Sequence, residues 1–260
     1  MKQIPLAITA LVITVLPVQA AEKIFTQTTF APYTVKWSDK DLTATASGAA
    51  IFSAQKLAAR ERPKKKDKTT VDRSFRLLSL VGPILSFQDE SSLDWPGMAH
   101  PGVGDVRRYQ AIDLRHPDKK ASLKDYFAAA DLASALSKHP LIKKALGSAK
   151  PKSLDELIKK IQDSDVEAKG EGDEQARLLF NRDMLSQFCF EKLSGNTVTV
   201  SISLYNQTDN EISPLKITLP VKGNDLTAWL SQADTSKAGI LDNKIETKNK
   251  DSETDFHFEP

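Results

Sequence analysis

The clearest pattern in the chain is an alternation of apolar and polar residues over 197–205. The apolar positions of this segment are Val198, Val200, Ile202 and Leu204. Threonine or serine fills the positions between them, and this period of two predicts a strand with one buried and one solvated face. Further strands are predicted before it, at 188–190, and after it, at 215–221, with a turn at 194–196.

The N-terminal half also has strand patterns. Residues 21–55 open with aromatic and β-branched positions among threonines, which favour strands. Residues 73–88 alternate in the same way and are interrupted at Gly82-Pro83, so two strands joined by a turn are expected. Residues 89–105 hold three glycines and two prolines and predict a loop. Residues 106–114 predict a further strand.

Helical patterns occupy the middle of the chain. Ser122 with Asp125 three residues later is a capping box, which predicts a helix that Pro140 ends. Further short helices are predicted at 141–146, 154–163 and 226–230. The order of strands, helices, strands and a closing helix predicts an α+β fold, in which helices pack on one face of a mostly antiparallel sheet.

The remaining segments divide the chain. N-terminal strands and a basic loop are expected over 21–72, and the α+β domain over 73–231. Residues 164–175 are acidic and contain glycine, so they predict a mobile loop. Residues 232–260 are polar and predict a disordered tail.

The first twenty residues resemble an export signal. Lys2 precedes an apolar run at 6–16, and Val18 and Ala20 supply small residues at positions −3 and −1 of a cleavage site. The run is shorter than the roughly 20 residues that a membrane span needs. We therefore expect residues 1–20 to be a signal peptide, and the mature chain to be periplasmic or secreted, without a stable membrane anchor.

Composition excludes several classes of protein. The 260 residues are 40% hydrophobic and 27% charged and include one cysteine, so no internal disulfide framework and no multi-cysteine zinc or iron–sulfur site is possible. No phosphate loop, nucleophile elbow or nucleotide-binding glycine motif occurs, and no cofactor or metal is expected. Residues 56–68 hold seven Lys or Arg against two Asp or Glu. Aromatic residues do not interleave with these bases, so a nucleic-acid partner is not expected.

Two segments carry candidate binding residues. The 92–105 loop presents Trp95, Met98 and His100, and an apolar loop tip with glycines can anchor a partner. The alternative is that Trp95 and Met98 fill the core and that His100 is structural. In the basic segment, Lys64, Lys65 and Lys66 could grip an anionic partner, or could belong to a solvated loop.

Candidate chemistry is sparse. His100 with Asp94 or Asp105 could act in acid–base catalysis, but no further ligand or orienting partner is visible at the required spacing. Cys189 lies between two phenylalanines in a predicted strand, which favours a small half-buried residue over a reactive thiol.

Several motifs in this order resemble the extracytoplasmic domain of the RsiV-like family. They are Ser79–Phe87, Gly97–Pro101, Ile112–Leu114 and Leu123–Phe127, followed by strands and a helix over 188–205 and 215–230. The resemblance covers about 73–231. The chain departs from the family pattern at 115–119 and 164–175, and in lacking its tyrosine-rich C-terminal motif beyond Tyr205.

The resemblance implies a domain that binds a partner in the cell envelope. The best-known member of the family is an anti-sigma-factor receptor that binds lysozyme. For this chain the expectation is an exported, non-enzymatic binding module whose partner is a lysozyme-like protein or peptidoglycan. The alternative is a cell-wall hydrolase or esterase that uses His100 with a nearby aspartate. Oligomeric state does not follow from the sequence.

Overall fold

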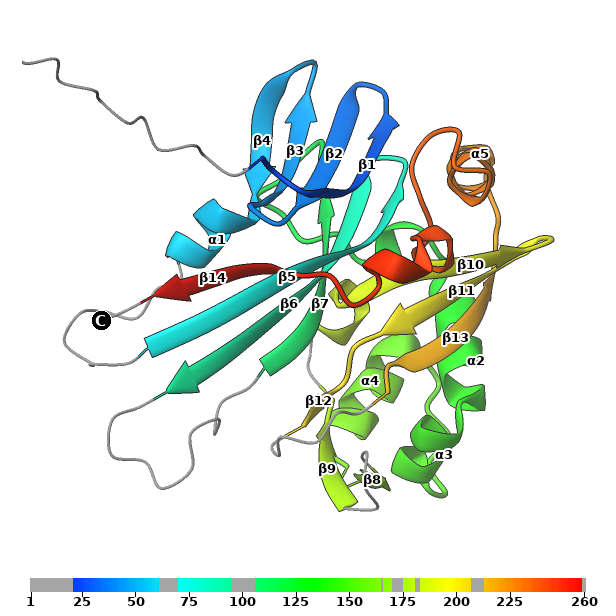
Figure 1. The fold of residues 1–260 in the computed structure, drawn as a ribbon. Coiled ribbons are helices and arrows are strands. Elements are labelled where there is room, and N and C mark those ends of the chain that lie inside the picture. The colour runs from blue at the N-terminus through cyan, green and yellow to red at the C-terminus, as the bar shows by residue number, and fades with distance from the viewer. Residues whose placement is uncertain are drawn as a thin grey trace, which may run out of the picture.

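The computed structural model describes residues 21–60, 70–94, 106–164, 166–169, 175–180, 183–206 and 213–258. Its strands pair antiparallel in four small sheets, and helices pack beside them (Figure 1). The α+β class predicted from the sequence is therefore confirmed.

An N-terminal meander forms the first sheet. Its strands run in order as β1 (Ile24–Phe30), β2 (Tyr33–Ser38), β3 (Leu42–Ala46) and β4 (Ala49–Ser53). Val35 and Trp37 alternate with half-buried positions on β2, so one face of the meander is apolar. That face packs on Phe75 and Phe87 of the central sheet, in one of two hydrophobic clusters formed by the described residues.

The central sheet has the strand order β14-β5-β6-β7. Its strands are β5 (Thr70–Val81), β6 (Ile84–Asp94), β7 (Val106–Asp113) and β14 (Thr254–Phe258). The Gly82-Pro83 turn joins β5 to β6 as predicted, with Val81 opposite Ile84.

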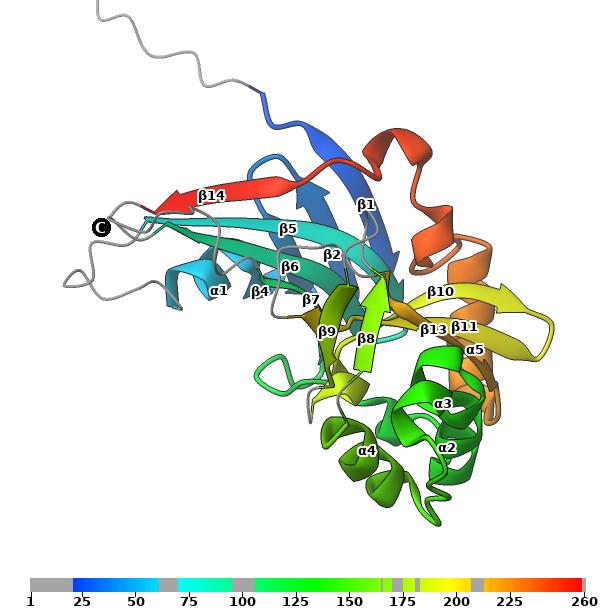
Figure 2. The same cartoon turned by 90° about the horizontal axis from the view of Figure 1, so that it is seen from below.

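Helices and a second sheet build the other hydrophobic cluster. A 3₁₀ turn, η2 (Leu123–Asp125), is followed by α2 (Ala129–Lys138), α3 (Pro140–Leu146) and α4 (Leu154–Gln162). The sheet they cover consists of β10 (Phe188–Ser194), β11 (Thr197–Ile202) and β13 (Leu215–Pro220). Leu132 and Leu136 of α2 are buried with Val198 and Val200 of β11. Figure 2 shows α2, α3 and α4 gathered on one side of this sheet.

Smaller elements complete the chain. They are β8 (Val166–Lys169), β9 (Gln175–Leu179), η3 (Met184–Ser186), β12 (Tyr205–Asn206), α5 (Asn224–Asp234), η4 (Asp242–Lys244) and η5 (Thr247–Asn249). The closing helix predicted near 226–230 is α5, and Trp229 on it packs over the β5–β6 turn.

The structure differs from the expected disordered tail at 232–260. Ile240 bridges Leu80 of β5, and β14 pairs with β5 along its length. Phe256 packs edge-on against Phe75 with ring centroids 5.8 Å apart. The tail is polar in composition, but its two phenylalanines and Thr254 supply enough apolar and hydrogen-bonding contact to complete a sheet.

Three predicted loops are also wrong in part. Strand β6 continues to Asp94, because residues 89–94 pair with 70–75 of β5. The expected loop over 164–175 contains β8 and the start of β9, which form a hairpin. The basic segment begins in a helix, α1 (Ala54–Arg60), where a loop was expected from Lys56 onward.

Candidate functional site

One cavity among the described residues is a groove of about 450 Å³. Strand β4 and helix α1 form one wall, and the segment after β7, residues 117–120, forms the other. The side chains of Phe52, Phe87 and Ile112 provide an apolar floor. Lys56, Arg60, Lys119 and Lys120 stand around this floor and are all exposed.

Local contacts explain why α1 forms beside the groove. The Ser53 hydroxyl accepts a hydrogen bond from the Lys56 amide at 3.2 Å, which caps the first turn. Asp41, the residue before β3, accepts from both the Ser53 hydroxyl and the Gln55 amide, and so connects this cap to the start of β3. Ala54 and Ala58, four residues apart, bury the inner face of the helix. Lys56 and Arg60 then lie on the outer face toward the groove.

The opposite wall is held by backbone hydrogen bonds. The His116 amide donates to the Asp113 carbonyl and the Lys119 amide to the His116 carbonyl, each at 2.8 Å. Lys120 forms an isolated bridge with Ile112, which returns the chain to the edge of β7. Arg115 pairs with Asp113, and the two side chains fix the start of this turn.

The floor connects to a buried ionic network. Gln110 lines the groove and donates through Nε2 to the Asp89 carboxylate. Arg73 donates to both oxygens of Asp89 at 2.7 and 2.8 Å, and Arg108 donates to Oδ2 at 2.9 Å. The Asp89 side chain is 2% exposed and that of Arg73 5%. Asp89 therefore fixes the orientation of the Gln110 amide under the groove.

The groove has an excess of positive charge. Its described lining residues include four cations and one acid, Asp118. Lys120 pairs with Asp183 at 3.2 Å. Within the described ranges, no ion pair joins Lys56, Arg60 or Lys119 to an acidic side chain. Among the described residues, no acidic side chain would therefore compete with an anion that enters the groove for these three cations.

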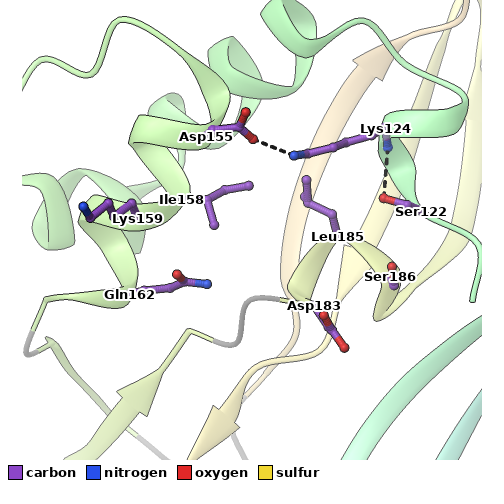
Figure 3. Close-up of a pocket in the computed structure, with 9 residues that line it drawn as sticks. All are labelled: Ser122, Lys124, Asp155, Ile158, Lys159, Gln162, Asp183, Leu185 and Ser186. Atoms are coloured by element: carbon purple, nitrogen blue, oxygen red, sulfur yellow. Dashed lines mark hydrogen bonds and ion pairs between the residues drawn. The ribbon is translucent and has the colours of Figure 1, made fainter.

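A second, smaller cavity of about 360 Å³ lies between α4 and the turns at 122–124 and 183–186 (Figure 3). Lys124 and Asp155 pair across it at 2.6 Å. Ile158 and Leu185 contribute apolar surface, and Gln162 extends from α4 toward the space. The Lys120–Asp183 pair borders both cavities, since Lys120 lines the groove and Asp183 lines the pocket.

The residues predicted to bind a partner lie outside the described residues. These are Lys64, Lys65, Lys66, Trp95, Met98 and His100, together with Asp105. The described ends of their two segments do lie together, because Thr70 at the start of β5 is the register partner of Asp94 at the end of β6. The structure therefore attaches both segments to the same end of the central sheet.

Other candidates have structural explanations. Cys189 is 1% exposed, and burial raises the pKa of its thiol well above the usual value, so it is more completely buried than expected and is poorly suited to act as a nucleophile. Burial lowers the pKa of His139, which ends α2. In the part of the chain that is described, no three His, Cys, Asp or Glu side chains are placed to hold a metal ion, and no helix is long and apolar enough to span a membrane.

Comparison with known proteins gives no relative for this chain. No protein-family model, curated protein or solved structure matches it.

Sequence reasoning did not single out several residues of the two cavities. The sequence pattern placed Lys119 in a turn and Gln110 at a polar position of a strand, and neither pattern indicated a binding role. Gln162 gave no signal, because a glutamine near the end of an amphipathic helix is ordinary. Lys56 and Arg60 did belong to the predicted basic segment, although the helix that presents them was not expected.

Proposed function

We propose that this chain is an exported binding module of the bacterial envelope and that its partner is peptidoglycan. The observation that carries the proposal is the groove between α1 and residues 117–120, with an apolar floor and three cations that pair with no described acid. Peptidoglycan combines carboxylates with methyl-bearing sugars and alanine side chains. Such a polymer matches both the rim and the floor of the groove.

Charge is the reason to favour peptidoglycan over a lysozyme-like protein. A c-type lysozyme is basic, and its positive surface would meet like charge at Lys56, Arg60 and Lys119, which costs affinity. The resemblance to the RsiV-like family supports a partner in the cell envelope, and it is equally consistent with peptidoglycan and with a lysozyme-like protein. The signal-like residues 1–20 agree with a periplasmic or secreted location, which N-terminal sequencing of the exported protein would test.

Co-sedimentation with purified, insoluble peptidoglycan tests the proposal. We expect residues 21–260 to sediment saturably with the wall, and Arg60→Glu with Lys119→Glu to weaken this binding at least tenfold. Lys237→Glu is the control for a single charge reversal away from the groove, because Lys237 is exposed and does not line the groove. Circular dichroism of each variant would establish that the fold is retained.

The alternatives give different results in the same assay. Saturable binding to a c-type lysozyme, with no sedimentation of the chain with the wall, would overturn the proposal in favour of the protein partner. Clearing of a wall suspension by the chain alone, lost in His100→Ala, would show instead a hydrolase. If the groove variant and the control variant bind the wall equally well, the groove is not the binding site.

A further inference from the structure

The pocket between α4 and the 183–186 turn has a chemistry distinct from that of the groove. Lys124 and Lys159 are balanced by Asp155 and Asp183, so the described lining carries no net charge. Ser122 and Ser186 add hydroxyl groups, each able to donate and to accept a hydrogen bond. A pocket of this kind favours an uncharged ligand rich in hydroxyl or amide groups.

One donor in the pocket lacks a partner. The Nε2 atom of Gln162 is shielded from solvent and makes no hydrogen bond with any described residue. A buried amide donor without an acceptor is unfavourable, and a ligand that supplies the acceptor relieves this cost. The terminal torsion of glutamine is broad, so the amide can turn into the cavity toward which Figure 3 shows the side chain extending. The missing group is therefore an acceptor such as a carbonyl oxygen.

Apolar surface lies close to this donor. Ile158 is one turn before Gln162 on the same helix, and Leu185 approaches from the facing turn (Figure 3). These two side chains can cover a methyl group beside the acceptor that Gln162 requires. A carbonyl bonded to a methyl is an acetyl group, and the acetamido substituent of an amino sugar carries one. The Lys124–Asp155 pair, which spans the pocket from the 122–124 turn to α4, offers a donor and an acceptor to ring hydroxyls.

The pocket also adjoins the groove. The Lys120–Asp183 pair, 3.2 Å long, joins a residue of the groove to a residue of the pocket. Residues 117–120 line the groove, and Ser122 and Lys124, just after them in the chain, line the pocket. A polymer with alternating neutral and anionic parts could therefore occupy both at once.

We propose that this pocket binds an N-acetylated amino sugar, with its acetamido carbonyl on Gln162 and its methyl group on Ile158 and Leu185. The inference rests on the proposed function in one respect, since such sugars form the glycan strands of peptidoglycan. It adds a second, neutral subsite beside the cationic groove.

Titration of residues 21–260 with a soluble tetramer of N-acetylglucosamine tests the subsite, because this probe carries no carboxylate. We expect saturable binding by calorimetry, at least a tenfold loss in Gln162→Leu and little change in Gln232→Leu, whose side chain is exposed on α5. A glucose tetramer lacks the acetamido group and should bind at least tenfold more weakly. Thermal unfolding of both variants would separate lost binding from lost folding.

The outcomes separate this inference from the proposed function. If the tetramer does not bind, binds as well to Gln162→Leu, or is matched by the glucose tetramer, the subsite is overturned even where the chain still sediments with the wall. If the tetramer binds through Gln162 but the chain does not sediment with the wall, the subsite stands and the proposed function fails.

Discussion

Asp89 is a buried carboxylate that accepts hydrogen bonds from three different side chains. Arg73, Arg108 and Gln110 donate to it, and the first two supply two positive charges for its one negative charge. A buried ionic group is stable only while its partners remain, because an uncompensated charge in the interior is costly. This network lies beneath the groove and sets the position of Gln110.

Asp89→Ala should be one of the most destabilising substitutions in the chain. It removes the bidentate partner of the buried Arg73, and we expect a loss of about 3–5 kcal/mol in the free energy of unfolding, measured by urea denaturation. Glu90→Ala is the control, since its pair with Arg107 is partly exposed and should contribute about 0–1 kcal/mol. Equal losses in the two variants would contradict the structural role given to Asp89.

Gly82 is held in a left-handed backbone conformation beneath an aromatic ring. Its φ is +59°, and an added Cβ would lie 2.4 Å from the Trp229 ring. Gly82→Ala should cost about 1–2 kcal/mol for the backbone and a further ~1–3 kcal/mol for the clash. Gly195 has a similar φ of +56° with open space around it, so Gly195→Ala should show only the backbone part. Thermal unfolding of both variants gives the comparison, and equal costs would argue against Trp229 over this turn.

Asp242 gives a prediction for the pH dependence of stability. Burial raises its pKa, opposed by the charge of Arg76, so the unfolded chain ionises before the folded one as pH rises. The folded state therefore loses stability as the pH rises above the ordinary aspartate pKa. This loss is complete once the pH exceeds the raised pKa of the folded state. Asp242→Asn should gain stability relative to the wild type at pH 7 and lose that advantage near pH 3. Chemical denaturation at each pH measures the difference in unfolding free energy between the variant and the wild type. If this difference is the same at pH 3 and pH 7, the assignment is contradicted.

Elements with strong periodicity were predictable, and elements that depend on distant partners were not. The alternation at 198–204 and the capping box at Ser122 gave β11 and the start of the helical layer. Strand β14 could not be predicted, because residues 254–258 lie in a polar segment and form a strand by pairing with the distant β5. Helix α1 was missed for a related reason: its cap depends on Ser53 and on Asp41, fourteen residues before the amide of Gln55. The floor of the groove joins β4, β6 and β7, a proximity that no local pattern contains.

The C-terminal strand should contribute measurable stability. Phe256 packs on Phe75, so Phe256→Ala should lower the free energy of unfolding by about 2 kcal/mol, less than for a fully buried phenylalanine because the ring is half-buried. Asp255 points to solvent on the same strand, and Asp255→Ala should change stability by less than about 0.5 kcal/mol. If neither variant alters urea denaturation, residues 254–258 would not pair with β5 in solution.

For the whole molecule, the central feature is that two cavities of different chemistry meet at residues 117–124. The groove has an apolar floor and an excess of cations, and the pocket is neutral and hydroxyl-rich. The Lys120–Asp183 pair between them is exposed, so its breaking by a bound polymer would cost little. The ionic part of binding should weaken with salt, because exposed charges are screened within a Debye length of about 8–10 Å near physiological ionic strength.

The most direct measurement is co-sedimentation of residues 21–260 with purified peptidoglycan at two salt concentrations, for the wild type, Arg60→Glu with Lys119→Glu, and Lys237→Glu. The account predicts saturable binding by the wild type and the Lys237 variant that weakens with salt, and at least tenfold weaker binding by the groove variant. Failure of the folded wild type to sediment with the wall at either salt concentration would contradict it.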